Sequence, residues 1–184
     1  MKELSLNVLD ITENSVKAGA TLIEISLTER DNTLTVTVTD NGCGMSEETV
    51  RAVTDPFYTT RTTRRVGLGI PIFKFAAEQT GGYITIKSKQ KTDGVEDHGT
   101  VVNAIFHTDH IDFTPLGDII STLVTLIQGH PEIDFVFKHE TDKGEVVLDT
   151  REVREVLEDT PLDTFEVLMW IRDNLKEQYE VIQF

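Results

Sequence analysis

The run Asp-Asn-Gly-Cys-Gly-Met at residues 40–45 contains the residue types of a binding site for a flat ligand. Asp40 supplies a carboxylate, and Gly42 and Gly44 follow it at alternate positions. Glycine has no Cβ and tolerates positive φ, so a ligand can approach the backbone closely at both positions. Asn-Gly is also the strongest short signal for a hairpin turn, so the run alone is equally consistent with a tight turn. Other segments must decide between a site and a turn.

The predicted helix over residues 3–18 places three polar side chains on one face. Asp10, Asn14 and Lys17 stand at positions i, i+4 and i+7, which share a face of an α-helix. Asn14 offers an amide oxygen to Mg²⁺, Lys17 can contact phosphate, and Asp10 can orient an attacking water or hydroxyl. Glu13 is a rival for the role of Asp10, but a residue adjacent to Asn14 should point off this face. The same pattern also suits a solvated polar face.

Two further short motifs could contact a ligand. The run Gly-Leu-Gly-Ile at residues 67–70 opens a predicted helix whose first turn includes Pro71,. Backbone N–H groups at a helix N-terminus favour phosphate. The pair Gly-Thr at residues 99–100 opens a predicted strand, where the Thr100 hydroxyl can reach a ligand. Neither motif is specific by itself, so the order of all four along the chain carries the argument.

The hydrophobic pattern predicts a mixed fold for the first part of the chain. Helices are predicted over residues 3–18, after residue 46, and from residue 67 to the glycine pair at 81–82,. Strands are predicted over residues 21–29, 33–39, 83–87 and 101–106, and a polar loop over 54–66,. This order indicates an α+β protein, a two-layer α/β sandwich with helices on one face of a mostly antiparallel sheet.

The rest of the chain differs in charge. Residues 1–111 carry 15 acids and 11 bases, whereas residues 112–184 carry 17 acids and 6 bases. We therefore predict a domain over residues 1–111 and an acidic C-terminal α/β extension over residues 112–184. The extension, a name kept below for residues 112–184, should contain helices over 115–128, 150–157 and 163–178, and a hairpin made by 134–138 and 145–148.

The overall composition excludes several classes of protein. The net charge of −15 argues against a nucleic-acid surface and against attraction to anionic membranes,. The single cysteine, Cys43, excludes an internal disulfide and a multi-cysteine zinc site, and it favours a reducing compartment,. With no apolar run of membrane-spanning length and no signal sequence, we expect a cytoplasmic protein.

In this order and spacing, the motifs resemble those of the GHKL superfamily, the histidine kinase-like ATPases, over about residues 4–107. Residues 10–21 are similar to its N box, and residues 40–45 to its first glycine box. Residues 55–61 resemble the start of the ATP lid of histidine kinases, and residues 67–70 resemble the second glycine box. The resemblance implies an α/β sandwich that holds Mg-ATP between its helices and a mobile lid.

The resemblance also implies roles for individual residues. Asn14 would bind Mg²⁺, Asp40 would accept a hydrogen bond from the adenine amino group, and Thr100 would lie near the adenine. The other residues expected at the ATP site are Lys17, Gly42, Gly44, Met45, Phe57, Thr59, Thr60, Arg61, Arg64, Arg65, Gly67, Leu68, Gly69 and Ile70.

Two features depart from the family pattern. The position four residues before Asn14 is usually Glu in hydrolysing members, and in this chain it is Asp10, whose carboxylate is set back by one methylene. Misplacement by about 1 Å can lower a rate by on the order of a hundredfold, so we expect slow turnover. The lid carries Arg61, Arg64 and Arg65, which fit contact with the γ-phosphate as well as they fit a solvated loop.

The sequence favours a stand-alone ATP-binding module. Few residues precede the first motif, and only residues 108–184 follow the region of resemblance, so we expect neither a dimerisation domain with an acceptor histidine nor the long further domains of mismatch-repair and gyrase proteins. We expect slow ATP hydrolysis, or phosphoryl transfer to a partner protein, in a regulatory role in signal transduction. The alternative is a non-catalytic nucleotide-sensing interaction protein, and a homodimer is left open.

Apolar residues crowd the last predicted helix and its approach. They are Leu162, Phe165, Leu168, Met169, Trp170, Ile171 and Leu175. The simplest interpretation is that they pack within the protein. A second hypothesis is that the acidic surface of the extension binds a basic protein partner.

Overall fold

A computed structural model describes residues 3–54, 69–94 and 96–183 of the chain. The first part contains α1 (Leu4–Lys17), β1 (Leu22–Arg30), β2 (Thr33–Asp40), α2 (Glu47–Thr54), α3 (Gly69–Gln79), β3 (Tyr83–Lys89) and β4 (Gly99–His107). The extension contains α4 (Ile119–Gly129), β5 (Asp134–Thr141), β6 (Gly144–Asp149), α5 (Thr150–Leu157) and α6 (Phe165–Gln183). Each predicted helix and strand is present, with ends shifted by a few residues. The predicted loop over 54–66 lies almost wholly outside the described residues.

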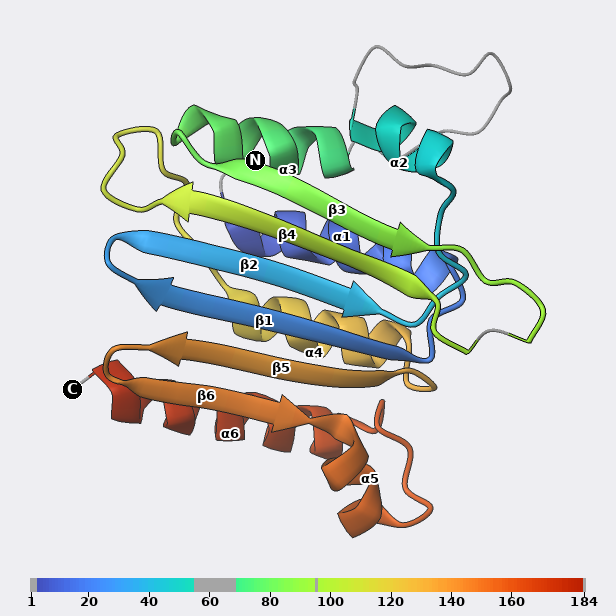
Figure 1. The fold of residues 1–184 in the computed structure, drawn as a ribbon. Helices are drawn as coiled ribbons and strands as arrows, with labels where there is room; N and C mark the ends of the chain where they lie inside the picture. The colour runs from blue at the N-terminus through green and yellow to red at the C-terminus, as the bar shows by residue number, and fades with distance from the viewer. Residues whose placement is uncertain (1–2, 55–68, 95, 184) are drawn as a thin grey trace.

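All strands belong to one six-stranded sheet in the order β3-β4-β2-β1-β5-β6 (Figure 1). The pairs β1–β2, β2–β4, β3–β4 and β5–β6 are antiparallel. β1 and β5 are parallel, with Ile25 opposite Phe137. The predicted two-layer α/β sandwich is therefore confirmed. The strands of the extension continue the sheet of the first part, and the division into two units at residue 111 stays a prediction.

The sequence of β2 explains why one face of the sheet is buried. Leu34, Val36 and Val38 alternate with threonines and are at most 1% exposed. Successive side chains of a strand point to opposite faces, so the threonines face away from this core. The helices α1, α3, α4 and α6 lie on the buried side of the sheet (Figure 1). None of the helices within the described residues is long and apolar enough to cross a membrane.

A loop of the extension caps the start of α1. The predicted helix start at Pro115 is wrong, because α4 begins only at Ile119. The carbonyls of Pro115 and Leu116 instead accept hydrogen bonds from the N–H groups of Leu4 and Ser5, at 2.9 and 2.8 Å. These amides belong to the first turn of α1, where N–H groups have no partner within the helix. The extension thus fixes one end of α1.

Two histidines of the extension bind carboxylates of the first part. Nε2 of His130 lies 2.9 Å from Glu13. Nε2 of the buried His139 lies 3.1 Å from Glu29, and its Nδ1 lies 2.8 Å from the hydroxyl of Tyr179. The hydrogen bond from His139 holds the pKa of Glu29 below its usual value, and burial raises the pKa of Tyr179. These contacts connect α4, β5 and α6 to α1 and β1.

Replacing Phe137 by alanine should destabilise the whole chain together. Phe137 is 1% exposed at the centre of β5, and truncation of a buried phenylalanine costs about 3–5 kcal/mol. We expect urea unfolding followed by far-UV circular dichroism and by fluorescence of Trp170, the single tryptophan, to shift to lower urea in parallel.

The matched control is Val181→Ala, because that side chain of α6 is 77% exposed. Its free energy of unfolding should change by less than about 0.5 kcal/mol. Two separate transitions for the two signals would show that the extension unfolds independently and would contradict the cooperative sheet.

Candidate functional site

A cavity of about 280 Å³ lies where α1 passes the end of β2 and the beginning of β4. Segments far apart in the sequence meet around it. The cavity is lined by Ile11, Asn14, Ser15, Lys17, Ala18, Asp40, Cys43, Gly44, Met45, Val53, Ile70, Thr100 and Val102. A mostly apolar wall with a few convergent polar groups is typical of a small-molecule site.

Asp40 is the buried charge of this cavity. The side chain of Ser15 donates a hydrogen bond to its Oδ2 at 2.6 Å, and the N–H of Gly42 donates to its Oδ1 at 2.9 Å. Thr100 stands directly opposite in β4. A buried carboxylate is costly unless it is hydrogen-bonded, and these two donors meet that need. Because a carboxylate has about four lone-pair sites, Asp40 can still accept a donor from a ligand.

The turn after β2 is held by the segment that follows α1. The side-chain oxygen of Asn41 accepts hydrogen bonds from the N–H groups of Thr21 and Leu22, at 2.8 and 3.0 Å. The N–H of Cys43 donates to the carbonyl of Ala18 at 2.8 Å. β2 pairs with β1 and β4, and the turn leads into α2. The Asn-Gly pair is therefore not a hairpin turn between neighbouring strands.

Glycine is required at two positions of this turn for different reasons. Gly44 has φ +65°, and a Cβ there would lie 2.0 Å from the carbonyl oxygen of Lys89. A Cβ on Gly42 would lie 2.8 Å from the Cβ of Ala18. Gly44 lines the cavity, whereas Gly42 packs against α1 and contributes its N–H to Asp40. Both positions exclude larger residues because the turn is packed between α1 and β3.

The polar face of α1 meets the cavity and the start of α3. Asn14 and Lys17 line the cavity, and Asp10 lies beside Gly69, where an added Cβ would be 3.1 Å from the Cβ of Asp10. Within the described residues, none of these three polar side chains has a hydrogen bond or ion pair. Glu13 points toward the end of α4 instead, as predicted for a residue off this face. Toward the described part of the chain, these three side chains therefore have unused donor or acceptor groups.

The residues that the structure describes contain no group of three His, Cys, Asp or Glu side chains that could hold a metal ion. Mg²⁺ commonly takes one or two oxygens from a protein and completes its shell with phosphates and water. The amide oxygen of Asn14, on the cavity wall, fits that kind of site.

The structure brings together predicted residues from separate segments. Those that line the cavity are Asn14, Lys17, Asp40, Gly44, Met45, Ile70 and Thr100. Asp10, Gly42 and Gly69 lie next to lining residues. The predicted residues outside the described part of the chain are Phe57, Thr59, Thr60, Arg61, Arg64, Arg65, Gly67 and Leu68. Their proposed contacts stay predictions.

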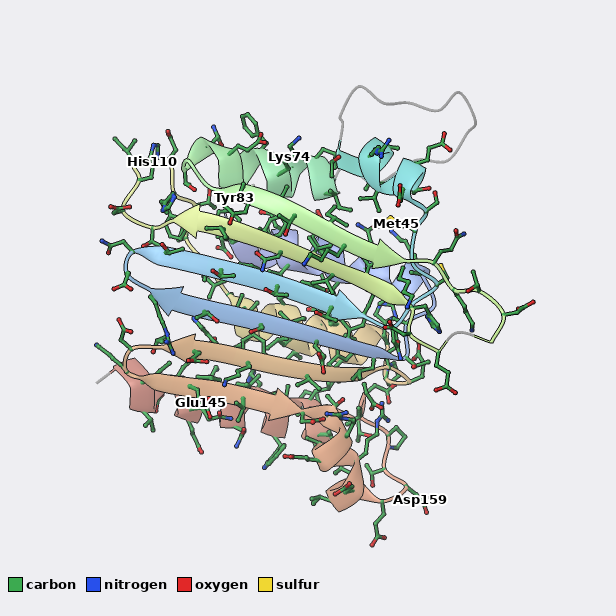
Figure 2. The ribbon with its side chains drawn as sticks, viewed as in Figure 1. Met45, Lys74, Tyr83, His110, Glu145 and Asp159 are labelled. Atoms are coloured by element: carbon green, nitrogen blue, oxygen red, sulfur yellow. The ribbon has the colours of Figure 1, made fainter. Side chains whose placement is uncertain are left out.

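Sequence reasoning missed the hydroxyls that support the site. The side chain of Ser88 lies 2.8 Å from the hydroxyl of Thr100 and accepts a hydrogen bond from the N–H of Met45 at 2.7 Å. Figure 2 shows Met45 beside the end of β3. No local signal marks Ser88, because its contact follows from the register of β3 and β4. Ser15 does carry a local signal, because it stands four residues after Ile11 and seven after Val8 and is thus a polar residue on the apolar face of α1,.

Comparison with known proteins identifies relatives of this region. The family described as histidine kinase-, DNA gyrase B-, and HSP90-like ATPase matches residues 2–110. The tetrathionate sensor histidine kinase TtrS of Salmonella typhimurium is 33% identical over 97 residues, which are 53% of this chain and 16% of TtrS. Sporulation kinase B of Bacillus subtilis is 29% identical over 89 residues, 47% of this chain and 21% of that kinase. The chain therefore spans only a small share of these relatives' length.

Solved structures share the fold over a longer stretch. The MutL ATPase domain of Aquifex aeolicus complexed with ADP has a TM-score of 0.54 and 16% identity, covering 86% of this chain and 70% of that chain. The N-terminal domain of a DNA repair protein has a TM-score of 0.57 and 17% identity, covering 81% of this chain and 53% of that chain. At such low sequence identity, these likenesses are evidence for a shared fold alone. Because the coverage exceeds residues 1–111, the shared fold includes elements of the extension.

Replacing Ser15 by alanine should destabilise the protein, because the buried Asp40 would lose one of its two donors. An unmet hydrogen bond of a buried group costs about 1–3 kcal/mol. The measurement is the urea midpoint at neutral pH. The matched control is Ser26→Ala in β1, since the half-buried hydroxyl of Ser26 has no hydrogen bond within the described residues. Equal losses in the two variants would contradict the role of Ser15.

Proposed function

The chain belongs to the histidine kinase-, DNA gyrase B-, and HSP90-like ATPase family, and we propose that it binds Mg-ATP in the cavity beside Asp40. The observation that carries the proposal is the buried Asp40 carboxylate, which has two donors from the protein and acceptor sites left over,. The adenine amino group would donate to Asp40. The apolar walls at Ile11, Val53 and Val102 suit the faces of a flat base.

The polar face of α1 suits the phosphates. The amide oxygen of Asn14 would take one place in the Mg²⁺ shell, and Lys17 would contact phosphate oxygens. Mg²⁺, when bound, supplies positive charge that neutralises the phosphates. The start of α3 at Gly69 offers backbone N–H groups of the kind that favour phosphate. These proposed roles are supported by the position of Lys17 and Asn14 on the cavity wall. They are also supported by the lack of a hydrogen bond or ion pair to either side chain within the described residues.

The proposed activity is slow ATP hydrolysis, or phosphoryl transfer to a partner protein, in a regulatory role. Asp10 would orient the attacking water or hydroxyl, since it lies beside the start of α3 and is exposed. The sequence similarity to sensor kinases supports the regulatory role. Arg61, Arg64 and Arg65 are proposed phosphate contacts on the basis of the sequence. A cytoplasmic location is proposed on the same basis.

The second candidate is a nucleotide sensor that binds ATP without catalysis. The shorter carboxylate of Asp10 favours it, because the family's hydrolysing members usually have Glu at this position. ATP would then act by ordering the surface around the cavity, which a partner would read. The two candidates share the same binding site and differ only in what happens at the γ-phosphate.

Replacing Asp40 by asparagine should strongly weaken ATP binding. We expect calorimetric titration of Mg-ATP into the wild-type protein to show micromolar-range binding, and the variant to bind about 30- to 100-fold more weakly, because a charged hydrogen bond is lost. Asp159→Asn is the matched control, since Asp159 is exposed in the loop after α5. Equal binding by the wild-type protein and Asp40→Asn would overturn the proposed base pocket.

Changes at Asp10 should separate the enzyme from the sensor. Asp10→Asn should retain ATP binding but release γ-phosphate at least about tenfold more slowly, because general-base groups contribute about 10²–10⁴ to a rate. Asp10→Glu should release it faster than the wild-type protein, because the carboxylate advances by one methylene. The measurement is release of labelled phosphate in the presence of Mg²⁺. Unchanged release in both variants would favour the sensor.

A further inference from the structure

The last helix buries most of its apolar residues and exposes two aromatic ones. The prediction that these residues pack within the protein is confirmed for the buried Leu162, Leu168, Ile171 and Leu175. Phe165 is 71% exposed and Trp170 is 55% exposed. Trp170 lies on the side of α6 that faces α5 and β6, since it lines a groove with residues of both.

The groove has a volume of about 430 Å³ and lies between β6, α5 and α6. Its apolar lining includes Val147 of β6, Val153, Val156 and Leu157 of α5, and Trp170 of α6. Val156 is 83% exposed and Val147 is 47% exposed. Exposed apolar side chains gathered in a depression and surrounded by polar residues mark interaction surfaces.

The groove is not suited to an added β-strand. β6 is an edge strand of the sheet, and edge strands can pair with an extended segment of another chain. The side chain of Gln178 occupies both outward backbone groups of Val147, accepting from its N–H at 2.8 Å and donating to its carbonyl at 3.0 Å. A partner can therefore fill the groove with side chains more readily than with backbone, as an amphipathic helix does.

Exposed carboxylates stand on the elements that form the groove and on the loop between α5 and α6. Glu152 lines it directly, and Glu166 stands one turn before Trp170 on the same side of α6,. Asp159, in the loop after α5, projects away from the sheet (Figure 2). Within the described residues, no ion pair is formed by Glu152, Glu155, Glu158, Asp159, Asp163 or Glu166.

Each arginine of α5 and α6 binds a carboxylate other than these six, and Asp149, the partner of Arg151, itself lines the groove. The pairs are Arg151 with Asp149, Arg154 with Asp134, and Arg172 with Asp173. Lys176 lines a different depression on the side of α6 that faces α4. The rim therefore presents negative charge to a ligand of opposite charge.

We propose that this groove docks an amphipathic helix of another protein, with apolar residues on one face and Lys or Arg along its flanks. The apolar face would cover Trp170 and Val156, and the cations would meet Glu152 and its neighbours. A second copy of this chain is a poorer occupant, because it would bring the same acidic rim against itself. The groove lies in the extension, so the proposal stands apart from nucleotide binding.

The test uses Trp170 as its own reporter, because it is the only tryptophan of the chain. The full chain is titrated with a synthetic helical peptide of about 14 residues, with Leu on one face and Lys on the other. We expect a saturable blue shift of the fluorescence that weakens as salt is raised. The same peptide with Glu in place of Lys should produce no shift at the same concentrations.

A matched pair of variants locates the binding. Val156→Ser should weaken binding of the Lys peptide about five- to tenfold, because an exposed valine of the groove loses its apolar contact. Val181→Ser should leave it unchanged, since that exposed valine of α6 lies outside the groove. Equal binding of the Glu peptide, equal weakening by both variants, or no shift with the Lys peptide would overturn the proposal. A dimer in sedimentation that Val156→Ser dissociates would assign the groove to a second copy.

Discussion

The buried carboxylate of Asp40 constrains the structure around it. A charge at the end of an apolar strand is tolerated only with hydrogen bonds, and its donors come from Ser15 of α1 and the N–H of Gly42. These hydrogen bonds therefore fix where α1 lies over β2 and how α1 is rotated about its own axis. That rotation turns Asn14 and Lys17 toward the cavity. The placement of the Gly42 N–H and the position of the polar face thus both follow from the hydrogen bonds of Asp40.

The extension holds the same helix at its first turn and again near Ser15. Carbonyls of the loop before α4 bind the first amides of α1, and His130 binds Glu13. β5 lies beside β1 in the sheet, and the fold shared with the MutL ATPase domain covers 86% of the chain. The candidate site is therefore supported from both parts of the chain, and removal of the extension would release the helix that carries Asn14.

Features with local causes could be predicted from the sequence. The alternation in β2, the face shared by Asp10, Asn14 and Lys17, and the glycines beside Asp40 follow from neighbouring residues. The parallel pairing of β5 with β1 and the contact of Ser88 with Thr100 depend on the register of distant segments. The spacing of Leu168, Ile171 and Leu175 places them on one face of α6 with Trp170 beside it, but the groove that Trp170 lines depends on how α6 packs against α5 and β6,.

The uneven charge of the chain is compatible with the two oppositely charged ligands that we propose for it. A nucleotide is a polyanion, and the first part has 15 acids against 11 bases, while the extension has 17 against 6. β1 and β5 separate β2 from β6, a distance of about 14 Å at the usual strand spacing. The Debye length at physiological salt is about 8 Å, so carboxylates beyond β6 are largely screened from phosphates bound near Lys17. Acidity gathered on the far edge can therefore attract a basic partner without weakening the cavity beside Asp40.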